Sequence, residues 1–373
     1  MAYGTVNTDI VADSSGGRLA PISSIFRNRI INGSMVIDQR NAGASVTPVN
    51  AQYLLDRWQA GLSAASKFSV QQNAGSVTPP VGFTKYLGCT SLSAYSIGAG
   101  DTFRIQQAIE GFNIADLGWG TANAKTVTLS FQVYSSLTGT FGGAIYNSAG
   151  ARSYPFSYSI PVANTWTTIS VTIAGDTSGT WATDNSAGIY VTLSLGAGST
   201  YSATAGSWAS GFYLSATGAT SVVGTNGATF YITGVQLEVG SSATGFEYRI
   251  YGTEFANCQR YYNKVLFGDT TAATTSGSNS FNYTTGLALS YYVFPVAMRS
   301  VPSFVTTGSA SSYQVLQSGG SVACSIVPTA GNVTTSTAQM NFSTSSGLNA
   351  GQASGVRGNN SSSNDWVAFN AEL

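Results

Sequence analysis

Stretches of alternating apolar and polar residues dominate the first two thirds of this chain. The clearest are TVTLSFQVYSS (126–136), TWTTISVTIAG (165–175), GIYVTLSLG (188–196) and ATFYITGVQLEVG (228–240). A period of two places the apolar side chains on one face of a β-strand, and the flanking Gly, Ser, Asn and Asp favour turns. No run shows a sustained helical period. Many short strands without long intervening helices predict a β-sandwich or jelly roll.

Three segments depart from this alternation. Short helical turns are predicted at NAQYLLDRWQA (50–60) and RIQQAIEGFNIADL (104–117), and TEFANCQRYYNK (253–264) predicts a helical turn or neck between domains. Strand-like runs resume after the neck at 281–307, 321–328, 337–344 and 365–373.

The predicted fold is all-β, in four parts. Residues 1–30 form an N-terminal anchoring arm, 31–250 a jelly-roll domain, 251–264 the neck, and 265–373 a smaller C-terminal β-sandwich domain. The arm is either a disordered tail or an extended segment that becomes ordered on a partner.

The charged residues exclude several classes of function. The chain has no histidine, which removes the usual general base, the Ser-His-Asp triad and every zinc site that contains histidine. Lys plus Arg is 15 and Asp plus Glu is 15, so no positive excess indicates nucleic-acid binding. Only 8% of residues are charged, against a usual share of about 25%. Such a surface favours association with copies of itself or with a larger assembly.

Membrane insertion, secretion and a disulfide framework are not expected. The first residues, MAYGTVNTDI, contain neither a basic start nor an apolar run, and no stretch is apolar enough to span a bilayer. The cysteines are three, Cys89, Cys258 and Cys324, and no two are close in sequence. We therefore expect a protein made in a cytoplasm without secretion.

Several motifs in one order resemble a family of bacteriophage tail fibre and receptor-binding proteins. They are FRNRIINGSMVIDQRNAG (26–43), LLDRWQAG (54–61), residues 107–158, residues 166–188 and FYITGVQLEVGSSATGFEYR (230–249). The likeness covers roughly residues 1–265, and CQRYY (258–262) with PVAMRSVPS (295–303) resembles the C-terminal domains of such fibres. Gly245 departs from the family's pattern, because a proline is expected in that turn.

The resemblance implies a non-enzymatic attachment protein of the virion tail, assembled in the host cytoplasm. It implies a homotrimer whose arm binds baseplate or tail proteins, and a host surface polysaccharide or lipopolysaccharide as receptor. Cyclic symmetry would make many weak sugar contacts multivalent. One alternative is a purely structural virion component, such as a head fibre, decoration or baseplate protein. Another is a polysaccharide depolymerase.

Residues 31–250 also resemble carbohydrate-binding-module jelly rolls. In those modules an early Asn-Gly strand pairs with a late strand, and the pair often holds a structural calcium ion. Here the late strand reads Tyr231-Ile232-Thr233-Gly234-Val235, and the early strand has Met35-Val36 in place of a glutamate. Calcium prefers carboxylate oxygens among its ligands, so we expect the fold without the ion, and no other metal or cofactor.

Aromatic residues in predicted loops are candidates for stacking on sugar rings. They are Trp181, Tyr201, Trp208, Tyr213 and Trp366, with a place in the core or at a subunit interface as the alternative. Trp58, Trp119 and Trp166 flank strand-like runs and are predicted to be core. Polar loops at 270–280 and 355–365, close to Trp366, are the expected receptor-binding surface.

The carboxylates are sparse. A glycosidase needs two carboxyl groups about 5–10 Å apart. The candidate sets are Asp176 with Asp184, or Asp101 with Glu110 and Asp116. Turn and helix-cap roles explain these residues more simply, so no catalytic residue is assigned.

Overall fold

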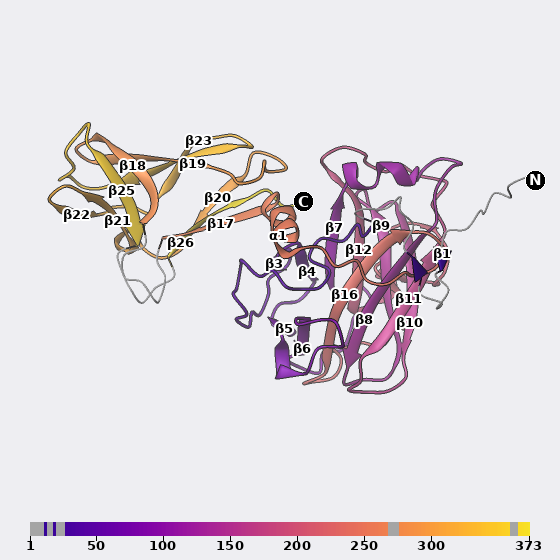
Figure 1. Cartoon of the computed structure of the whole chain (residues 1–373). Coiled ribbons are helices and arrows are strands. Elements are labelled where there is room, and N and C mark those ends of the chain that lie inside the picture. The colour runs from indigo at the N-terminus through magenta and orange to yellow at the C-terminus, as the bar shows by residue number, and fades with distance from the viewer. Residues whose placement is uncertain (1–10, 13–17, 20–26, 268–275, 359–364) are drawn as a thin grey trace, which may run out of the picture.

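The computed structural model describes all residues except 1–10, 13–17, 20–26, 268–275 and 359–364. Two β-domains lie side by side and are joined by one α-helix (Figure 1). Most of the predicted arm, residues 1–30, lies outside the described residues. No helix in the described part of the chain has the length and apolar character needed to cross a membrane.

Two antiparallel sheets form the first domain. The seven-stranded sheet has the order β14 (Ala209–Ser210), β10 (Arg152–Ile160), β9 (Gly139–Asn147), β12 (Ala187–Ala197), β7 (Thr102–Glu110), β4 (Trp58–Leu62), β3 (Tyr53–Leu55). The five-stranded sheet has the order β11 (Thr167–Ile173), β8 (Val127–Ser135), β16 (Thr229–Val239), β6 (Leu87–Ser91), β5 (Phe68–Gln72). The inward faces of both sheets form one hydrophobic core, so the jelly-roll prediction is confirmed.

The four alternating sequence runs correspond to β8, β11, β12 and β16. In β8, for example, Leu129, Phe131 and Val133 are at most 1% exposed, while the residues between them face away from the core. The period of two therefore identified both the strands and their buried faces.

Short elements complete this domain. The two-residue strands β13 (Ser202–Ala203) and β15 (Ser215–Ala216) pair with each other in this domain, whereas β1 (Val11–Ala12) and β2 (Arg18–Leu19) form a separate pair in the N-terminal segment. The 3-10 helices are η1 (Ala74–Ser76), η2 (Gly111–Asn113), η3 (Ala115–Leu117) and η4 (Ser199–Tyr201). Residues 198–222 cross the outer face of the seven-stranded sheet, where Ser215 lies against Gly142 of β9.

The helical turn predicted at 50–60 is wrong. The segment forms the β3–β4 hairpin, in which Leu55 is paired with Trp58. Leu54, Leu55 and Trp58 all enter the core, because the tight turn at Asp56-Arg57 brings them together with a spacing that imitates a helix.

The prediction for 104–117 is half right. Residues up to Glu110 belong to β7, and only η2 and η3 are helical. The consecutive glutamines Gln106 and Gln107 interrupt the apolar and polar alternation of β7, so the strand could not be recognised from its period. Gln107 is buried because its side-chain amide exchanges two hydrogen bonds with the backbone of Ile31, at 2.9 and 2.8 Å.

Motifs distant in sequence meet at one end of this domain. The Asn28 side chain bonds the backbone of Val235 and Leu237 in β16, and the Gly33 carbonyl accepts from the Val235 N–H at 3.0 Å. A Cβ on Gly33 would lie 2.2 Å from the Val235 oxygen, so only glycine permits this approach. The expected pairing of the early Asn-Gly segment with the late strand therefore forms, although residues 28–37 are not a regular strand.

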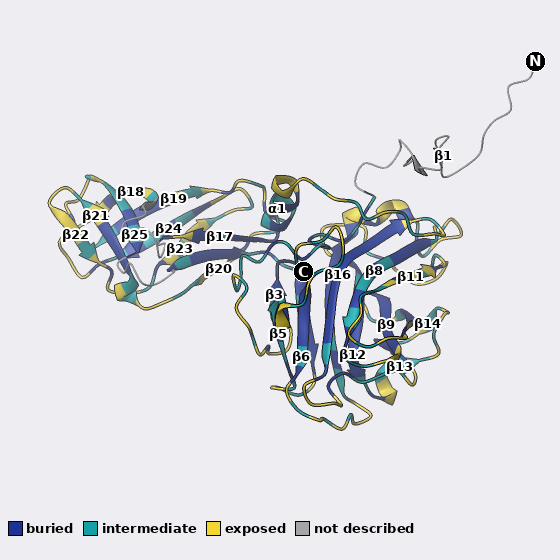
Figure 2. Ribbon diagram, turned by 60° about the horizontal axis from the view of Figure 1, so that its bottom comes forward, coloured by how far each residue is buried: buried dark blue, intermediate teal, exposed yellow. Residues whose placement is uncertain are grey.

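The second domain is a smaller β-sandwich that follows α1 (Tyr251–Gln259). One sheet has the order β17 (Tyr262–Leu266), β26 (Trp366–Asn370), β20 (Ser303–Thr306). The other has the order β22 (Gly320–Ala323), β21 (Tyr313–Gln317), β25 (Ala353–Gly358), β18 (Ser276–Thr284), β19 (Leu287–Val293), β24 (Thr337–Ser343), β23 (Thr329–Val333). The 3-10 helix η5 (Ala310–Ser312) precedes β21. Each domain has its own buried core, visible as dark strands in Figure 2.

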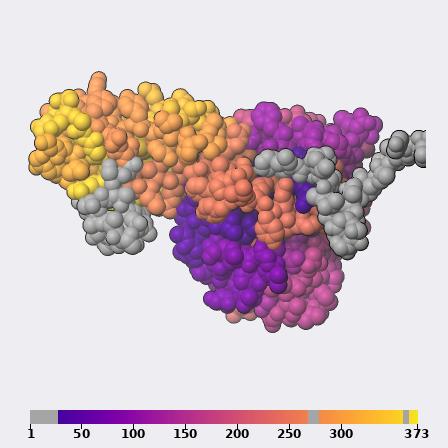
Figure 3. All heavy atoms as spheres, in the orientation of Figure 1, coloured from indigo at the N-terminus to yellow at the C-terminus, as the bar shows by residue number. Residues whose placement is uncertain are grey.

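Ionic contacts connect the two domains beside α1, where the two lobes meet in Figure 3. Glu372, after β26, pairs with Arg57 of the β3–β4 turn and with Arg40, and its side chain is 4% exposed. Arg260, after α1, pairs with Glu110 of β7 at 2.6 Å. Arg299 donates to the carbonyl oxygens of Asn185, Ala371 and Glu372. The junction is thus built from ion pairs and hydrogen bonds between the domains, and the Arg57–Glu372 pair among them is buried.

Candidate functional site

Two of the aromatic candidates belong to a buried tryptophan cluster. Trp119, Trp181 and Trp208 meet edge to face, with ring centroids 4.8–5.4 Å apart. Their indole N–H groups donate to the backbone carbonyl oxygens of Lys125, Ser178 and Ala174. Trp181 is 7% exposed and Trp208 is packed on the same core, so the structure favours the core alternative for both. Trp58 and Trp119 are core, as predicted, and Trp166 is half-buried against Tyr86.

The other candidates do not converge with them. Tyr201 and Tyr213 are half-buried in the crossing segment 198–222, and Trp366 is half-buried in β26 of the other domain beneath the Lys264 ammonium, 4.8 Å away. The loops predicted at 270–280 and 355–365 lie largely outside the described residues, apart from their continuations into β18 and β25. The five aromatic residues therefore do not form one site.

Each candidate carboxylate already has a structural partner. Asp176 is paired with Arg152 at 2.7 Å, and Glu110 with Arg260. Asp116 is paired with Arg29, while Asp101 and Asp184 accept hydrogen bonds within turns. Within the described residues, no group of three or more Cys, Asp or Glu side chains could hold a metal ion. Cys89, Cys258 and Cys324 are all buried and unpaired.

An open groove lies on the outer face of the seven-stranded sheet, close to the domain junction. Its volume is about 460 Å³, and its lining side chains come from β4, β7, β9, β12 and the crossing segment, with Leu373 at one end. The lining residues are Gln59, Gln106, Tyr146, Ser148, Ala149, Gly150, Tyr190, Phe212 and Leu373. These aromatic and amide side chains make it the best candidate for a binding site.

Cross-strand neighbours form the aromatic wall of the groove. Tyr190 of β12 pairs with Tyr146 of β9, and their rings stack with centroids 4.8 Å apart and planes 2° apart. Phe212 meets Tyr146 edge to face at 5.0 Å. On its other side Tyr190 pairs with Ala108 of β7. On that side its strand neighbour is therefore a methyl group, and Tyr190 lines the groove.

A chain of hydrogen bonds holds the amide wall. Gln106 Nε2 donates to Gln59 Oε1 at 2.8 Å, and Gln106 Oε1 accepts from Tyr146 Oη at 2.9 Å. Gln59 Nε2 in turn donates to the Ala51 carbonyl. The planar amides are therefore fixed beside the Tyr190 ring, where their remaining donors and acceptors can meet hydroxyl groups.

Three arginines influence the Tyr190 phenol. Burial raises the pKa of its phenol, and the charges of Arg57, Arg104 and Arg299 oppose that rise. Glu372 neutralises Arg57. Neither Arg104 nor Arg299 forms an ion pair with any described carboxylate.

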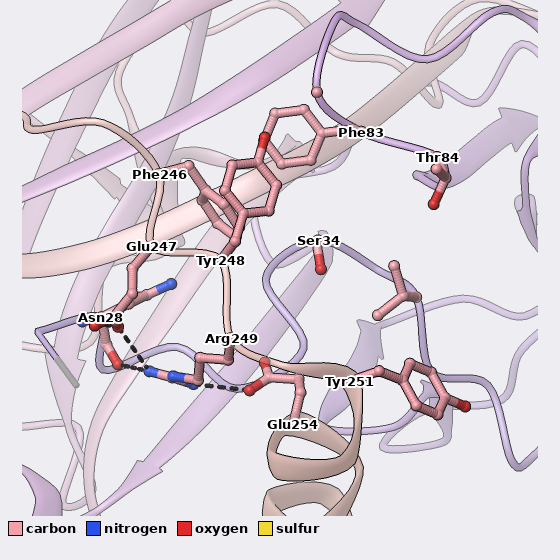
Figure 4. A pocket seen from close by; sticks show the side chains of 12 residues that line it. Asn28, Ser34, Phe83, Thr84, Phe246, Glu247, Tyr248, Arg249, Tyr251 and Glu254 are labelled. Atoms are coloured by element: carbon pink, nitrogen blue, oxygen red, sulfur yellow. Dashed lines mark hydrogen bonds and ion pairs between the residues drawn. The ribbon is translucent and has the colours of Figure 1, made fainter. Parts of the chain in front are cut away.

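A second hollow, of about 240 Å³, lies where the early segment, the loop before Lys85 and the linker to α1 meet (Figure 4). Phe83, Phe246 and Tyr248 form its aromatic side, with centroids 4.9–5.6 Å apart. Arg249 is held by Glu254 and Glu247, at 3.0 and 3.4 Å. These charged groups tie the linker to the jelly roll, so this hollow is a structural joint.

The groove residues were missed from sequence, although a signal was present. In 188–196 the apolar residues Ile189, Val191 and Leu193 face the core, so Tyr190 occupies the polar phase of the alternation. Tyr146 is likewise out of phase with the core residue Ile145. An aromatic side chain at a polar-phase position of a central strand is the pattern that marks this site.

No protein-family model matches the chain, and no curated protein sequence matches it. Among solved structures, it is similar to the enzymatically active domain of bacteriophage CBA120 tailspike protein 4, with 12% identity and a TM-score of 0.32. That match covers 58% of this chain and only 22% of the tailspike chain.

Carbohydrate-binding modules are also similar. TmCBM61, solved with β-1,4-galactotriose, has 10% identity and a TM-score of 0.29, covering 57% of this chain and 99% of the module. The family 11 module of Clostridium thermocellum, solved with a mixed-linked tetrasaccharide, has 9% identity and a TM-score of 0.27, covering 54% and 96%.

Proposed function

We propose that this protein is a non-enzymatic attachment protein of a bacteriophage tail, and that it binds a host surface saccharide in the groove of the seven-stranded sheet. The observation that carries the proposal is the stacked Tyr146–Tyr190 pair, which lines the groove together with the hydrogen-bonded amides of Gln59 and Gln106. An aromatic face offers apolar contact to the C–H side of a sugar ring, and amides bond its hydroxyls. The ordered motifs in residues 26–249 support the phage assignment.

The expected binding is weak for each copy. The groove is wide and shallow, and its polar groups are few, so firm attachment depends on several copies engaging one polysaccharide. The trimer, the anchoring arm and the location on the tail are parts of this proposal that follow from the resemblance to tail fibres.

The test is binding of the purified chain to an array of bacterial surface polysaccharides, with Tyr190→Ala compared against Tyr291→Ala. Tyr291 is 59% exposed on β19 of the second domain, so it is a strand tyrosine outside the groove whose loss should not disturb the fold. We expect at least a tenfold loss of affinity for Tyr190→Ala and no loss for Tyr291→Ala. The opposite result would place the receptor site in the second domain. Absence of saccharide binding by the unaltered chain would favour a purely structural virion component.

A further inference from the structure

Arg104 lies beside the groove, hydrogen-bonded to the lining residue Gln106. It lies on β7 between Thr102 and Gln106, two positions that share its face of the strand. Its Nε donates to Gln106 Oε1 at 2.8 Å, and its Nη1 donates to Thr102 Oγ1 at 3.2 Å. A guanidinium has five N–H donors, and these two hydrogen bonds engage two of them.

Gly61 of the neighbouring strand β4 leaves the space that the Arg104 guanidinium occupies. A Cβ on Gly61, its cross-strand neighbour in β4, would lie 2.4 Å from Arg104 Cζ and 2.7 Å from Nε. The guanidinium therefore lies directly over Gly61, in space that any larger residue would occupy. The same Gln106 oxygen accepts from Arg104 and from Tyr146, which connects the charge to the aromatic wall.

No described Asp or Glu side chain forms an ion pair with Arg104. The acidic groups nearest the groove are already engaged, Glu372 by Arg57 and Arg40, and Glu110 by Arg260. Arg299 bonds only backbone carbonyl oxygens, so it adds a second uncompensated charge near Tyr190. Groove-lining residues include no Asp or Glu.

We propose that the groove selects an anionic saccharide, whose carboxylate or phosphate pairs with the open edge of the Arg104 guanidinium while a neighbouring sugar ring lies on Tyr190. This inference rests on the proposed saccharide binding and adds the class of ligand. Arginine suits the task because its planar fork matches a carboxylate or phosphate with two parallel hydrogen bonds.

The experiment is an array of neutral, uronate-containing, sialylated and phosphate-containing saccharides, followed by titration calorimetry with the best acidic oligosaccharide. If the ligand carries a carboxylate, its methyl ester is the matched neutral probe, because only the charge is removed. We expect binding that weakens with salt and falls at least tenfold in Arg104→Gln, whereas binding of the neutral probe is the same in both proteins. Preference for the uronate or the phosphate members of the array distinguishes the two sources of negative charge.

Two further variants separate charge from position. Arg104→Lys keeps the charge but loses the fork, and Gly61→Ala keeps the arginine but displaces its guanidinium, so both are expected to weaken acidic binding. Arg357→Gln is the control, because Arg357 is a half-buried arginine of the second domain whose Nη2 bonds Ser321. Melting curves of all variants establish that each is folded.

Equal binding of acidic and neutral saccharides, or unchanged acidic binding in Arg104→Gln, would overturn this inference. Either result leaves the proposed function intact, provided that Tyr190→Ala still weakens binding. If no saccharide binds to the unaltered chain, the proposed function fails, and the assignment of an anionic ligand fails with it.

Discussion

Replacing Glu372 by glutamine leaves Arg57 as a buried charge without a counter-ion. Arg57 is 1% exposed, its Nη1 pairs with Glu372, and its Nη2 donates to the Ala108 carbonyl at 2.6 Å. Burial, the largest single effect, lowers the pKa of Arg57, but Glu372 together with Tyr261, Tyr53 and Cys258 raises the pKa above its usual value. The guanidinium therefore remains charged in the folded protein.

Removal of one partner of a buried ion pair costs about 3–5 kcal/mol of unfolding free energy. The Tyr261 ring, whose centroid is 3.5 Å from Arg57 Cζ, and the Ala108 carbonyl still stabilise the charge. We therefore expect Glu372→Gln to lower the free energy of unfolding by about 3 kcal/mol. Asp116→Asn is the control. Its pair with Arg29 is exposed, with Asp116 48% accessible, so it is expected to cost at most about 1 kcal/mol.

Urea unfolding followed by tryptophan fluorescence measures both changes. A second readout is the radius of gyration from small-angle scattering, because Glu372 links the two domains and its loss should loosen the junction. Replacing both partners, Arg57→Met with Glu372→Leu, should recover part of the stability, since no unpaired charge is then buried. A cost for Glu372→Gln no larger than that for Asp116→Asn would refute the view that this pair holds the domains together.

Three further predictions concern pH, metal and assembly. Burial raises the pKa of Asp56 to about 7, so between about pH 4 and 7 the folded protein binds more protons than the unfolded chain. The free energy of unfolding therefore falls as the pH rises through this range, by at most about 4 kcal/mol. Urea unfolding at several pH values should show this fall, and Asp56→Asn should remove the pH dependence. A calcium chelator should leave the melting temperature of the whole chain unchanged, whereas a drop of several degrees would reveal an oxygen-ligand site. Sedimentation of the purified protein at micromolar concentration should give a trimer, and a stable monomer would count against the proposed architecture.

The amino-acid sequence determined the all-β class and the strands with the clearest alternation. In β8, β11 and β12 the alternation located the strand and its core face, because successive side chains of a strand point to opposite faces. In β16 a bulge between Thr233 and Gln236 shifts the phase, so that Phe230 and Val235 both enter the core. The fold class followed from the number of these strands. Where local spacing imitated a helix, as at Leu54, Leu55 and Trp58, the prediction was wrong because the turn between two strands is not visible as a period.

Only the tertiary structure decided which strands are neighbours, and therefore where the site is. Alternation says that Tyr146 and Tyr190 face outward, but not that β9 and β12 place them side by side. The same holds for Gly61 beneath Arg104, and for Glu372, which reaches Arg57 across 315 residues of sequence. Strands pair through backbone N–H and C=O groups, which are common to nearly all residues, so the sequence of one strand does not identify its neighbouring strand. The strand order and register of the folded sheet bring these outward-facing side chains together to line one groove.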